Sequence, residues 1–412
     1  MSRAGRSVRR LRVAAALAGL ALVAAWGAGG STTADPEPTD GSSTGGEATG
    51  TPSAPATSVQ PSHGTSASPA ASSPLRRGEK RTTLTMPAAY TPSAPTGVGT
   101  DDYRCFLLDP GLDEDVYLTG TNVLPGNPSV VHHVILFRVP PDKVREAERL
   151  DDSTPGEGWT CFGGSGISGE FNNLDDASWL GAWAPGGKES VTRNGYGVEL
   201  APGSRIVMQV HYNLLAGASP DTSSTQIRWM PRSADLTPIH TYLMPAPVEL
   251  PCRPGHDSGP LCDRDAAVAD VKARFGFGPG STADLLHLLC QTPTEPSEVS
   301  SCTRTVGRPM TILGVAGHMH LLGRSIRIEV NPGTPRARTV LRIPVWDFDN
   351  QGAKPIRPVH LDPFDTVRVT CRHVQWLRDK LPSFEGQQEK YVVWGEGTTD
   401  EMCLGLLQVT FD

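Results

Sequence analysis

The chain has 412 residues, with 37 Lys or Arg against 44 Asp or Glu, so its formal net charge is −7 at neutral pH. This length allows two or three domains of ordinary size. The acidic balance argues against a nucleic-acid partner, which would require a basic face.

Residues 1–30 have the pattern of a cleavable signal peptide. Five arginines precede an almost unbroken apolar run over Val13–Ala25, and small residues follow it up to Gly30. Loss of these five arginines would move the net charge from −7 to about −12. An uncleaved N-terminal anchor is the alternative, although the apolar stretch is short for a bilayer span. We therefore expect a secreted protein, or one on the extracellular face of the cell envelope, with no further membrane segment.

Residues 31–85 are rich in Ser, Thr, Pro, Ala and Gly and contain no aromatic residue. Such a segment buries too little apolar surface to offset the entropy lost on ordering. We expect a disordered linker over 31–85.

Residues 86–412 have the pattern of an all-β fold. Short β-branched or alternating runs are bounded by Pro- and Gly-rich turns, which predicts two consecutive jelly-roll-like β-sandwich domains over 86–235 and 236–412. One Ala- and Leu-rich stretch, Asp263–Cys290, predicts a small helical hairpin inserted in the second domain. The predicted strands include Val130–Val139, Ser204–Asn213, Ser325–Val330, Thr366–Cys371 and Leu404–Phe411.

All eight cysteines fall in this folded part. An even number in an exported chain predicts four disulfides, and the absence of any Cys-x-x-Cys pair weakens a thiolate metal site. The cysteines are therefore expected to be structural, and the chemistry must come from other residues.

Five of the 11 histidines lie in apolar, strand-like contexts. Residues two apart share a face of a strand, so His318 and His320 can bind one metal ion. His132 and His133 are adjacent and normally point to opposite faces, so both reach one ion only at a sheet rim or a strand twist. His211, on a separate predicted strand, would be the third ligand. Each motif alone has a structural explanation, but their combination is hard to attribute to packing.

The donor set favours copper or zinc, because no carboxylate lies within the histidine clusters. A thioether ligand would select Cu(I) over Zn(II). Met402 is a candidate, although Met208 and Met319 are nearer to histidines in the sequence.

Six segments occur in one order between residues 100 and 412: Asp-Tyr103-Arg-Cys105, VVHHVILF, Trp159-Thr-Cys161, MQVHYN, GHMHLLGRSI and DEMC. This order resembles the copper type II, ascorbate-dependent monooxygenases, the family of peptidylglycine α-hydroxylating and dopamine β-monooxygenases. The resemblance implies two copper-binding β domains that face each other across an open cleft. It also implies that dioxygen and an external reductant, ascorbate or another one-electron donor, hydroxylate a C–H bond of a small organic substrate.

Carried over by position, the resemblance assigns two copper ligand sets. His132, His133 and His211 would hold an electron-transferring copper in the first domain. The second, dioxygen-activating copper would be held in the second domain by His318, His320 and Met402.

The resemblance also implies the disulfides Cys105–Cys161 and Cys371–Cys403. For the remaining four cysteines, a helical hairpin brings its ends together, which favours Cys262–Cys290 with Cys252–Cys302 outside it.

Departures from the family concern the substrate. Ala316 stands where peptide-amidating members carry an arginine, and Leu404 and Leu406 replace polar and aromatic residues. These residues predict a pocket for a less polar substrate. Tyr103 and Gln209 are expected to contact the copper ligands without binding copper themselves.

Two other functions remain open at this point. One is a non-catalytic secreted copper-binding protein, and the other is a zinc hydrolase built on one histidine cluster. We expect the protein to be monomeric.

Overall fold

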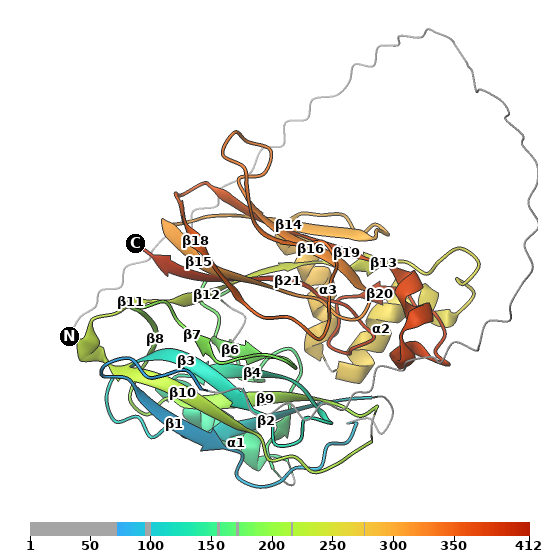
Figure 1. The fold of residues 1–412 in the computed structure, drawn as a ribbon. Coiled ribbons are helices and arrows are strands. Elements are labelled where there is room, and N and C mark those ends of the chain that lie inside the picture. Colours follow the sequence, from blue (N-terminus) through green and yellow to red (C-terminus); the bar gives the residue numbers. More distant parts are fainter. Residues whose placement is uncertain (1–71, 95–99, 155–156, 170–172, 216, 276) are drawn as a thin grey trace, which may run out of the picture. The chain divides into compact units, whose positions relative to one another are not determined.

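The computed structural model describes residues 72–94, 100–154, 157–169, 173–215, 217–275 and 277–412. The predicted signal peptide and residues 31–71 of the predicted linker lie outside this part of the chain. Strands dominate the described residues and helices are few, which confirms the all-β prediction (Figure 1). No helix among these residues is long and apolar enough to span a bilayer.

The first sandwich uses strands that precede residue 239. One sheet has the order β1-β10-β3-β8-β11, with β7 also paired to β3, and the other has the order β5-β2-β9-β4-β6. The strands are β1 (Lys80–Thr85), β2 (Asp101–Leu108), β3 (Val116–Leu124), β4 (Val131–Val139), β5 (Trp159–Thr160), β6 (Trp179–Trp183), β7 (Ser190–Val191), β8 (Tyr196–Leu200), β9 (Arg205–Asn213), β10 (Ser224–Pro231) and β11 (Thr237–Pro238).

The second sandwich uses the strands from residue 240 onward. Its two sheets have the orders β12-β21-β15-β18 and β14-β19-β16-β17, and β13 pairs with β20 beside them. The strands are β12 (His240–Ala246), β13 (Glu249–Leu250), β14 (Val299–Thr305), β15 (Met310–His318), β16 (Gly323–Val330), β17 (Arg338–Ile343), β18 (Lys354–Leu361), β19 (Thr366–His373), β20 (Val392–Val393) and β21 (Cys403–Phe411).

The alternation along β9 shows how the first sandwich positions a site. Ile206, Met208 and Val210 are fully buried in the core between its two sheets. Because successive side chains point to opposite faces, Gln209 and His211 project from the outer face of the same sheet. The predicted ligand His211 therefore lies on the outer face of the sheet. Packing of the opposite face in the core fixes the strand that carries it.

The two sandwiches contact each other through the segment that leads into β6. The backbone N–H of Ala177 donates to Thr241 O at 2.9 Å, and the N–H of Leu243 donates to Leu174 O at 2.7 Å. The Trp179 carbonyl accepts a hydrogen bond from the Thr241 hydroxyl. These bonds attach the outer face of the first sandwich to β12 of the second.

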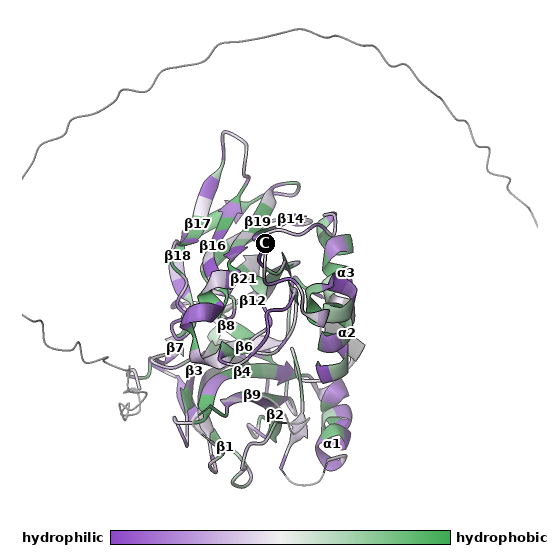
Figure 2. Cartoon of the chain, turned by 90° about the vertical axis from the view of Figure 1, so that its right-hand side faces the viewer, coloured by the Kyte–Doolittle hydropathy of each residue, from purple (hydrophilic) through white to green (hydrophobic). Residues whose placement is uncertain are grey.

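The predicted helical hairpin is present. Helices α2 (Arg264–Phe275) and α3 (Phe277–Cys290) pack side by side and carry both apolar and polar residues (Figure 2). The buried Glu249 carboxylate anchors the hairpin, because it accepts hydrogen bonds from Arg264, His287 and the Tyr391 hydroxyl.

One helix was not predicted. The sequence of α1 (Val144–Asp152), VREAERLDD, is so highly charged that its apolar stripe is narrow, and only Ala147 is buried. The shorter 3-10 helices are η1 (Pro141–Lys143), η2 (Arg232–Ala234), η3 (Pro260–Cys262), η4 (Gln375–Lys380) and η5 (Pro382–Phe384).

The predicted linker extends too far along the chain. Residues 80–85 form β1, an edge strand that pairs with β10 from Lys80 opposite Trp229 to Thr85 opposite Ser224. Only Leu84 of this strand is buried. The linker prediction over 31–85 is therefore wrong for 80–85, because backbone pairing orders a segment that has almost no apolar side chains.

All four disulfides are formed. Cys105–Cys161 and Cys371–Cys403 agree with the pairing that the resemblance implies. The nested pairing of the other four cysteines is wrong, because Cys252 bonds Cys262 and Cys290 bonds Cys302.

The register of the hairpin explains the error. Arg264, at the start of α2, lies beside Asp284 rather than beside the end of α3. Six further residues of α3 place Cys290 about 9 Å beyond that contact. Cys290 therefore meets β14, and Cys262 meets the loop after β13.

Peptide mapping under non-reducing conditions should recover one linked peptide pair for Cys252–Cys262 and one for Cys290–Cys302. These bonds close short loops beside the hairpin, so no rearrangement of the chain is needed to form them. A Cys262–Cys290 peptide in the folded protein would contradict the hairpin register.

Candidate metal centre

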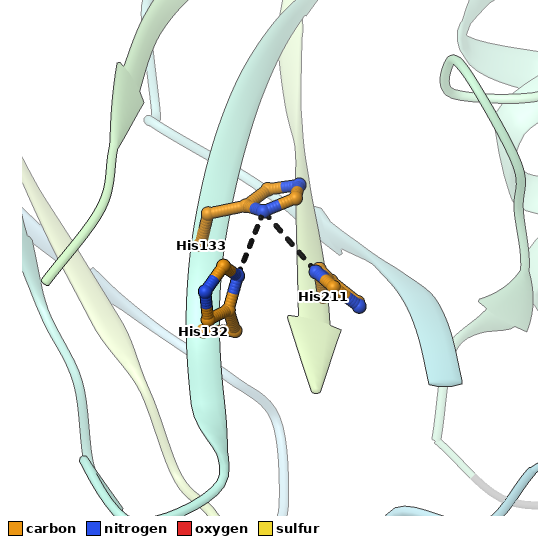
Figure 3. A group of neighbouring side chains, drawn as sticks. All are labelled: His132, His133 and His211. Atoms are coloured by element: carbon orange, nitrogen blue, oxygen red, sulfur yellow. Dashed lines mark hydrogen bonds between the residues drawn. The ribbon is translucent and has the colours of Figure 1, made fainter. Parts of the chain in front are cut away.

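A β-bulge brings the first three histidines together. His133 lies directly opposite His211 of β9, but Val131 lies opposite Tyr212, so β4 has one extra residue at His132. A bulge breaks the alternation of side chains. His132 and His133 therefore both approach His211, as Figure 3 shows.

The spacing of these imidazoles fits a metal ion. The Nδ1 atom of His133 lies 3.3 Å from Nδ1 of His132 and 3.1 Å from Nδ1 of His211. Two nitrogens bound to one ion at about 2.0–2.1 Å in tetrahedral geometry are separated by about 3.3 Å. The three histidines, hereafter the His132 group, thus have the donor type and spacing that a bound ion requires.

Asp101 fixes the orientation of His211. Its Oδ1 atom accepts a hydrogen bond from His211 Nε2 at 2.7 Å and another from the Thr398 hydroxyl. With the proton on Nε2, the Nδ1 lone pair of His211 faces the other two histidines. This carboxylate–imidazole pair is the arrangement that commonly orients metal-bound histidines.

Burial favours the neutral form of His133 and His211. It lowers the pKa of His133 well below its usual value and lowers that of His211 to about 4, although Asp101 opposes the second shift. A neutral imidazole is the form that binds metal. Ligand nitrogens are therefore available at neutral pH without prior loss of a proton.

Of the two predicted supporting residues, Tyr103 contacts a ligand directly. Its ring stacks on His211 with centroids 4.2 Å apart, and its hydroxyl donates to Glu396 O at 2.7 Å. Gln209 instead donates to Gly164 O at 2.7 Å and lies beside Cys161. Gln209 thus contacts the segment around the Cys105–Cys161 disulfide rather than a histidine.

His318 and His320 form the second group. They lie at and just beyond the end of β15, with ring centroids 5.1 Å apart. His318 Nδ1 donates to Gln351 Oε1 at 2.6 Å, and His320 Nδ1 lies 3.3 Å from the Asp400 carbonyl oxygen. Because Nδ1 makes these contacts, Nε2 is the atom of each ring that would bind a metal ion. Burial also lowers the pKa of His318 to about 3.

The backbone of Met402 lies close to that of His320. His318, the last residue of β15 that pairs with β21, lies opposite Leu404, and the backbone N–H groups of His320 and Met402 both donate to Glu401 Oε2. The Met402 side chain is buried. Met208 and Met319, the methionines nearer to histidines in sequence, are fully buried in the two sandwich cores.

Glu401 ties the Met402 segment to the histidine pair. Its fully buried carboxylate accepts backbone hydrogen bonds from His320 at 2.9 Å, Leu322 at 2.6 Å and Met402 at 3.2 Å. His373 Nε2 lies 3.3 Å from the same carboxylate. One buried acid therefore fixes both chain segments of the second group.

The two groups lie close together. The rings of His133 and His318 are 6.0 Å apart, and Tyr103 and Asp101 of the first sandwich bond to Glu396 and Thr398 of the second. The open cleft implied by the family resemblance does not separate them in the described residues. Contacts from the segment before β6 and from the 396–398 segment close it.

The predicted substrate residues flank His318 on β15 and β21. Ala316 lies opposite Leu406, and His318 lies opposite Leu404. This face meets a buried apolar cluster, hereafter the helix-side cluster, which α2 and α3 cover. Its buried members are Ala177, Leu243, Ala267, Val271, Ala283, Leu286, Tyr391, Val393, Trp394, Met402 and Leu404.

Several contacting residues were missed by the sequence analysis. Asp101 precedes Tyr103 by two positions in one strand and so shares its face, a signal that could have identified it. Glu401 stands within the DEMC segment beside Met402. Phe348 and Gln351 lie in the loop between β17 and β18, and only the tertiary fold brings them to the histidines.

No family model and no curated protein matches the chain. Three solved structures share a distant likeness with it. A structure of allantoicase is 13% identical over 71% of this chain and 78% of its own, with a TM-score of 0.16. An infectious bursal disease virus VP2 subviral particle is 8% identical over 83% and 75%, with a TM-score of 0.19. A mutant Bacillus subtilis oxalate decarboxylase is 9% identical over 80% and 77%, with a TM-score of 0.15.

Replacing Asp101 by Asn should weaken metal binding at the His132 group by about 10–100-fold, the usual cost of losing a partner of a metal-bound histidine. Titration with Cu(I) in competition with a chromophoric chelator measures this affinity. The matched control is Asp102→Asn, because Asp102 is the next residue of β2 and bonds Tyr90 and Ser93 instead. Equal affinity in both variants would refute the role of Asp101.

Proposed function

We propose that the protein is a secreted copper-dependent monooxygenase that hydroxylates a C–H bond of a small organic substrate. The observation that carries the proposal is the convergence of His132, His133 and His211 beside a second histidine pair, whose backbone lies close to that of Met402. The four disulfides support an oxidising, extracytoplasmic location.

The donor set supports copper over other metals. Imidazole nitrogens form the first group, and the second adds a thioether, which favours Cu(I). Two buried carboxylates beside the histidines are already engaged: Asp101 by His211 and Thr398, and Glu401 by backbone N–H groups. Hard cations that need several carboxylate ligands are therefore disfavoured.

The reaction needs electrons from outside the protein. A substrate C–H bond and the O–O bond of dioxygen break, a C–O bond forms, and two electrons and two protons complete the second product, water. Ascorbate or another one-electron donor supplies the two electrons in separate steps. Copper bound by His132, His133 and His211 and by His318, His320 and Met402 would supply storage of one electron per ion and the activation of dioxygen.

The residues of the chain orient the ligands and limit the access of water. Asp101 and Gln351 direct the metal-facing nitrogens of His211 and His318. The helix-side cluster surrounds Met402 and Leu404 with apolar side chains. A dry environment strengthens electrostatic interactions and suppresses loss of reactive species to water.

Ascorbate-driven oxygen consumption by the copper-loaded protein should fall in Met402→Leu by more than the 10–100-fold typical of an outer-sphere change. Leucine conserves volume but lacks the thioether. Met319→Leu is the control, since Met319 is buried in the second core. Copper binding without oxygen consumption in the parent protein would indicate a carrier instead.

A glycine-extended peptide should be a poor substrate compared with neutral aryl-alkyl compounds. A charge-assisted bond to a carboxylate contributes about 1.5–3 kcal/mol, and Ala316, Leu404 and Leu406 provide no such bond. Ala316→Arg should improve turnover of the peptide only modestly, because partner residues are also lacking. Comparison of kcat/KM at fixed copper and ascorbate tests this, and efficient peptide hydroxylation by the parent protein would contradict it.

A further inference from the structure

The loop between β17 and β18, residues 344–353, reaches the histidines of both groups. The Phe348 ring stacks on His132 with centroids 4.5 Å apart and an interplanar angle of 20°. The same ring lies 6.2 Å from the His320 ring. Gln351 of this loop accepts the hydrogen bond from His318.

The loop is braced on its own sandwich. Trp346 is largely buried in the second core, and its backbone N–H donates to Arg324 O at 3.0 Å. Gln351 is held at both ends of its amide, because Nε2 donates to Phe348 O at 2.7 Å while Oε1 accepts from His318. The contact with Gln351 thus also positions Phe348.

The contacts with the first sandwich are weaker. Asp349 Oδ1 lies 3.5 Å from His132 Nε2, and 63% of the Asp349 side chain is exposed. Stacking of one ring on another is a modest interaction. The loop can therefore leave His132 without disturbing the core that anchors Trp346.

We propose that the β17–β18 loop covers one side of the metal centre and selects which molecules reach the histidines. Phe348 is its specificity-determining residue. The apolar ring covers His132 and faces His320, so an entering molecule must displace it or pack against it. Neutral, aromatic or alkyl compounds satisfy that contact, whereas charged ones do not. The substrate part of this inference rests on the proposed function, but the role of the loop as a cover does not.

Labelling of histidines with diethylpyrocarbonate in the full-length chain, with copper removed, tests the cover directly. Phe348→Ala should speed labelling of His132 and His320 about fivefold, which is the effect of losing one aromatic contact on a local opening equilibrium. Gln351→Ala should speed it as well. Val345→Ala is the control, because Val345 belongs to the same loop and is 64% exposed. His256 and His360, each with a half-exposed side chain, serve as internal references.

The substrate arm uses the copper-loaded protein with ethylbenzene and a bulkier 4-tert-butyl analogue. Phe348→Ala should raise the kcat/KM ratio of bulky to small substrate, and Val345→Ala should leave it unchanged. Equal labelling of His132 and His320 in all variants would overturn the cover, and an unchanged ratio would overturn the assignment of Phe348. Faster labelling in a protein that consumes no oxygen would leave the cover intact and refute the proposed monooxygenase activity.

Discussion

Successive side chains of a β-strand point to opposite faces of the sheet, so two adjacent histidines can share an ion only where this alternation breaks. The bulge in β4 breaks it at His132, while the pairing of His133 with His211 holds the second and third imidazoles on neighbouring strands. The remaining features of the first group depend on this bulge. Asp101 orients a ring that the sheet has already placed, and Tyr103 stacks on that ring from the other neighbouring strand.

The second group is built differently. Its histidines follow the ordinary period of two, but His320 lies beyond the last paired residue of β15. Ladder hydrogen bonds therefore cannot fix it, and the buried Glu401 carboxylate replaces them by accepting the N–H groups of His320, Leu322 and Met402. Because this acid links two chain segments, it sets the position of the histidine pair and of the methionine together.

The sequence predicted those features of the fold and the site that have a local pattern of apolar and polar residues. Alternating apolar runs predicted the strands, and period-two spacing explained why His318 and His320 share a face. Adjacent histidines at 132 and 133 required a break in the strand, but only the pairing with β9 identified it as a bulge. The charged helix α1 and the Thr-rich strand β1 have little apolar signal, so neither was predicted. Phe348 and Gln351 come from a surface loop, and no periodicity specifies where such a loop folds.

The two histidine groups also lie closer together than the family resemblance implies, with His133 and His318 6.0 Å apart. The Tyr103 hydroxyl donates to the Glu396 carbonyl and the Thr398 hydroxyl donates to Asp101, and these hydrogen bonds join the sandwiches at that point. Electron transfer between two ions held there would need no long path through solvent. The β17–β18 loop covers both groups from one side, so access and metal positioning depend on the same few contacts.

Metal analysis of the purified full-length chain after copper loading and removal of excess copper tests the central claim most directly. We expect two coppers per chain, held by two groups with different donor sets. X-ray absorption of the Cu(I) form should then show a sulfur scatterer at one site in addition to imidazole nitrogens. A single tightly bound zinc ion, or two coppers with only nitrogen donors, would contradict it.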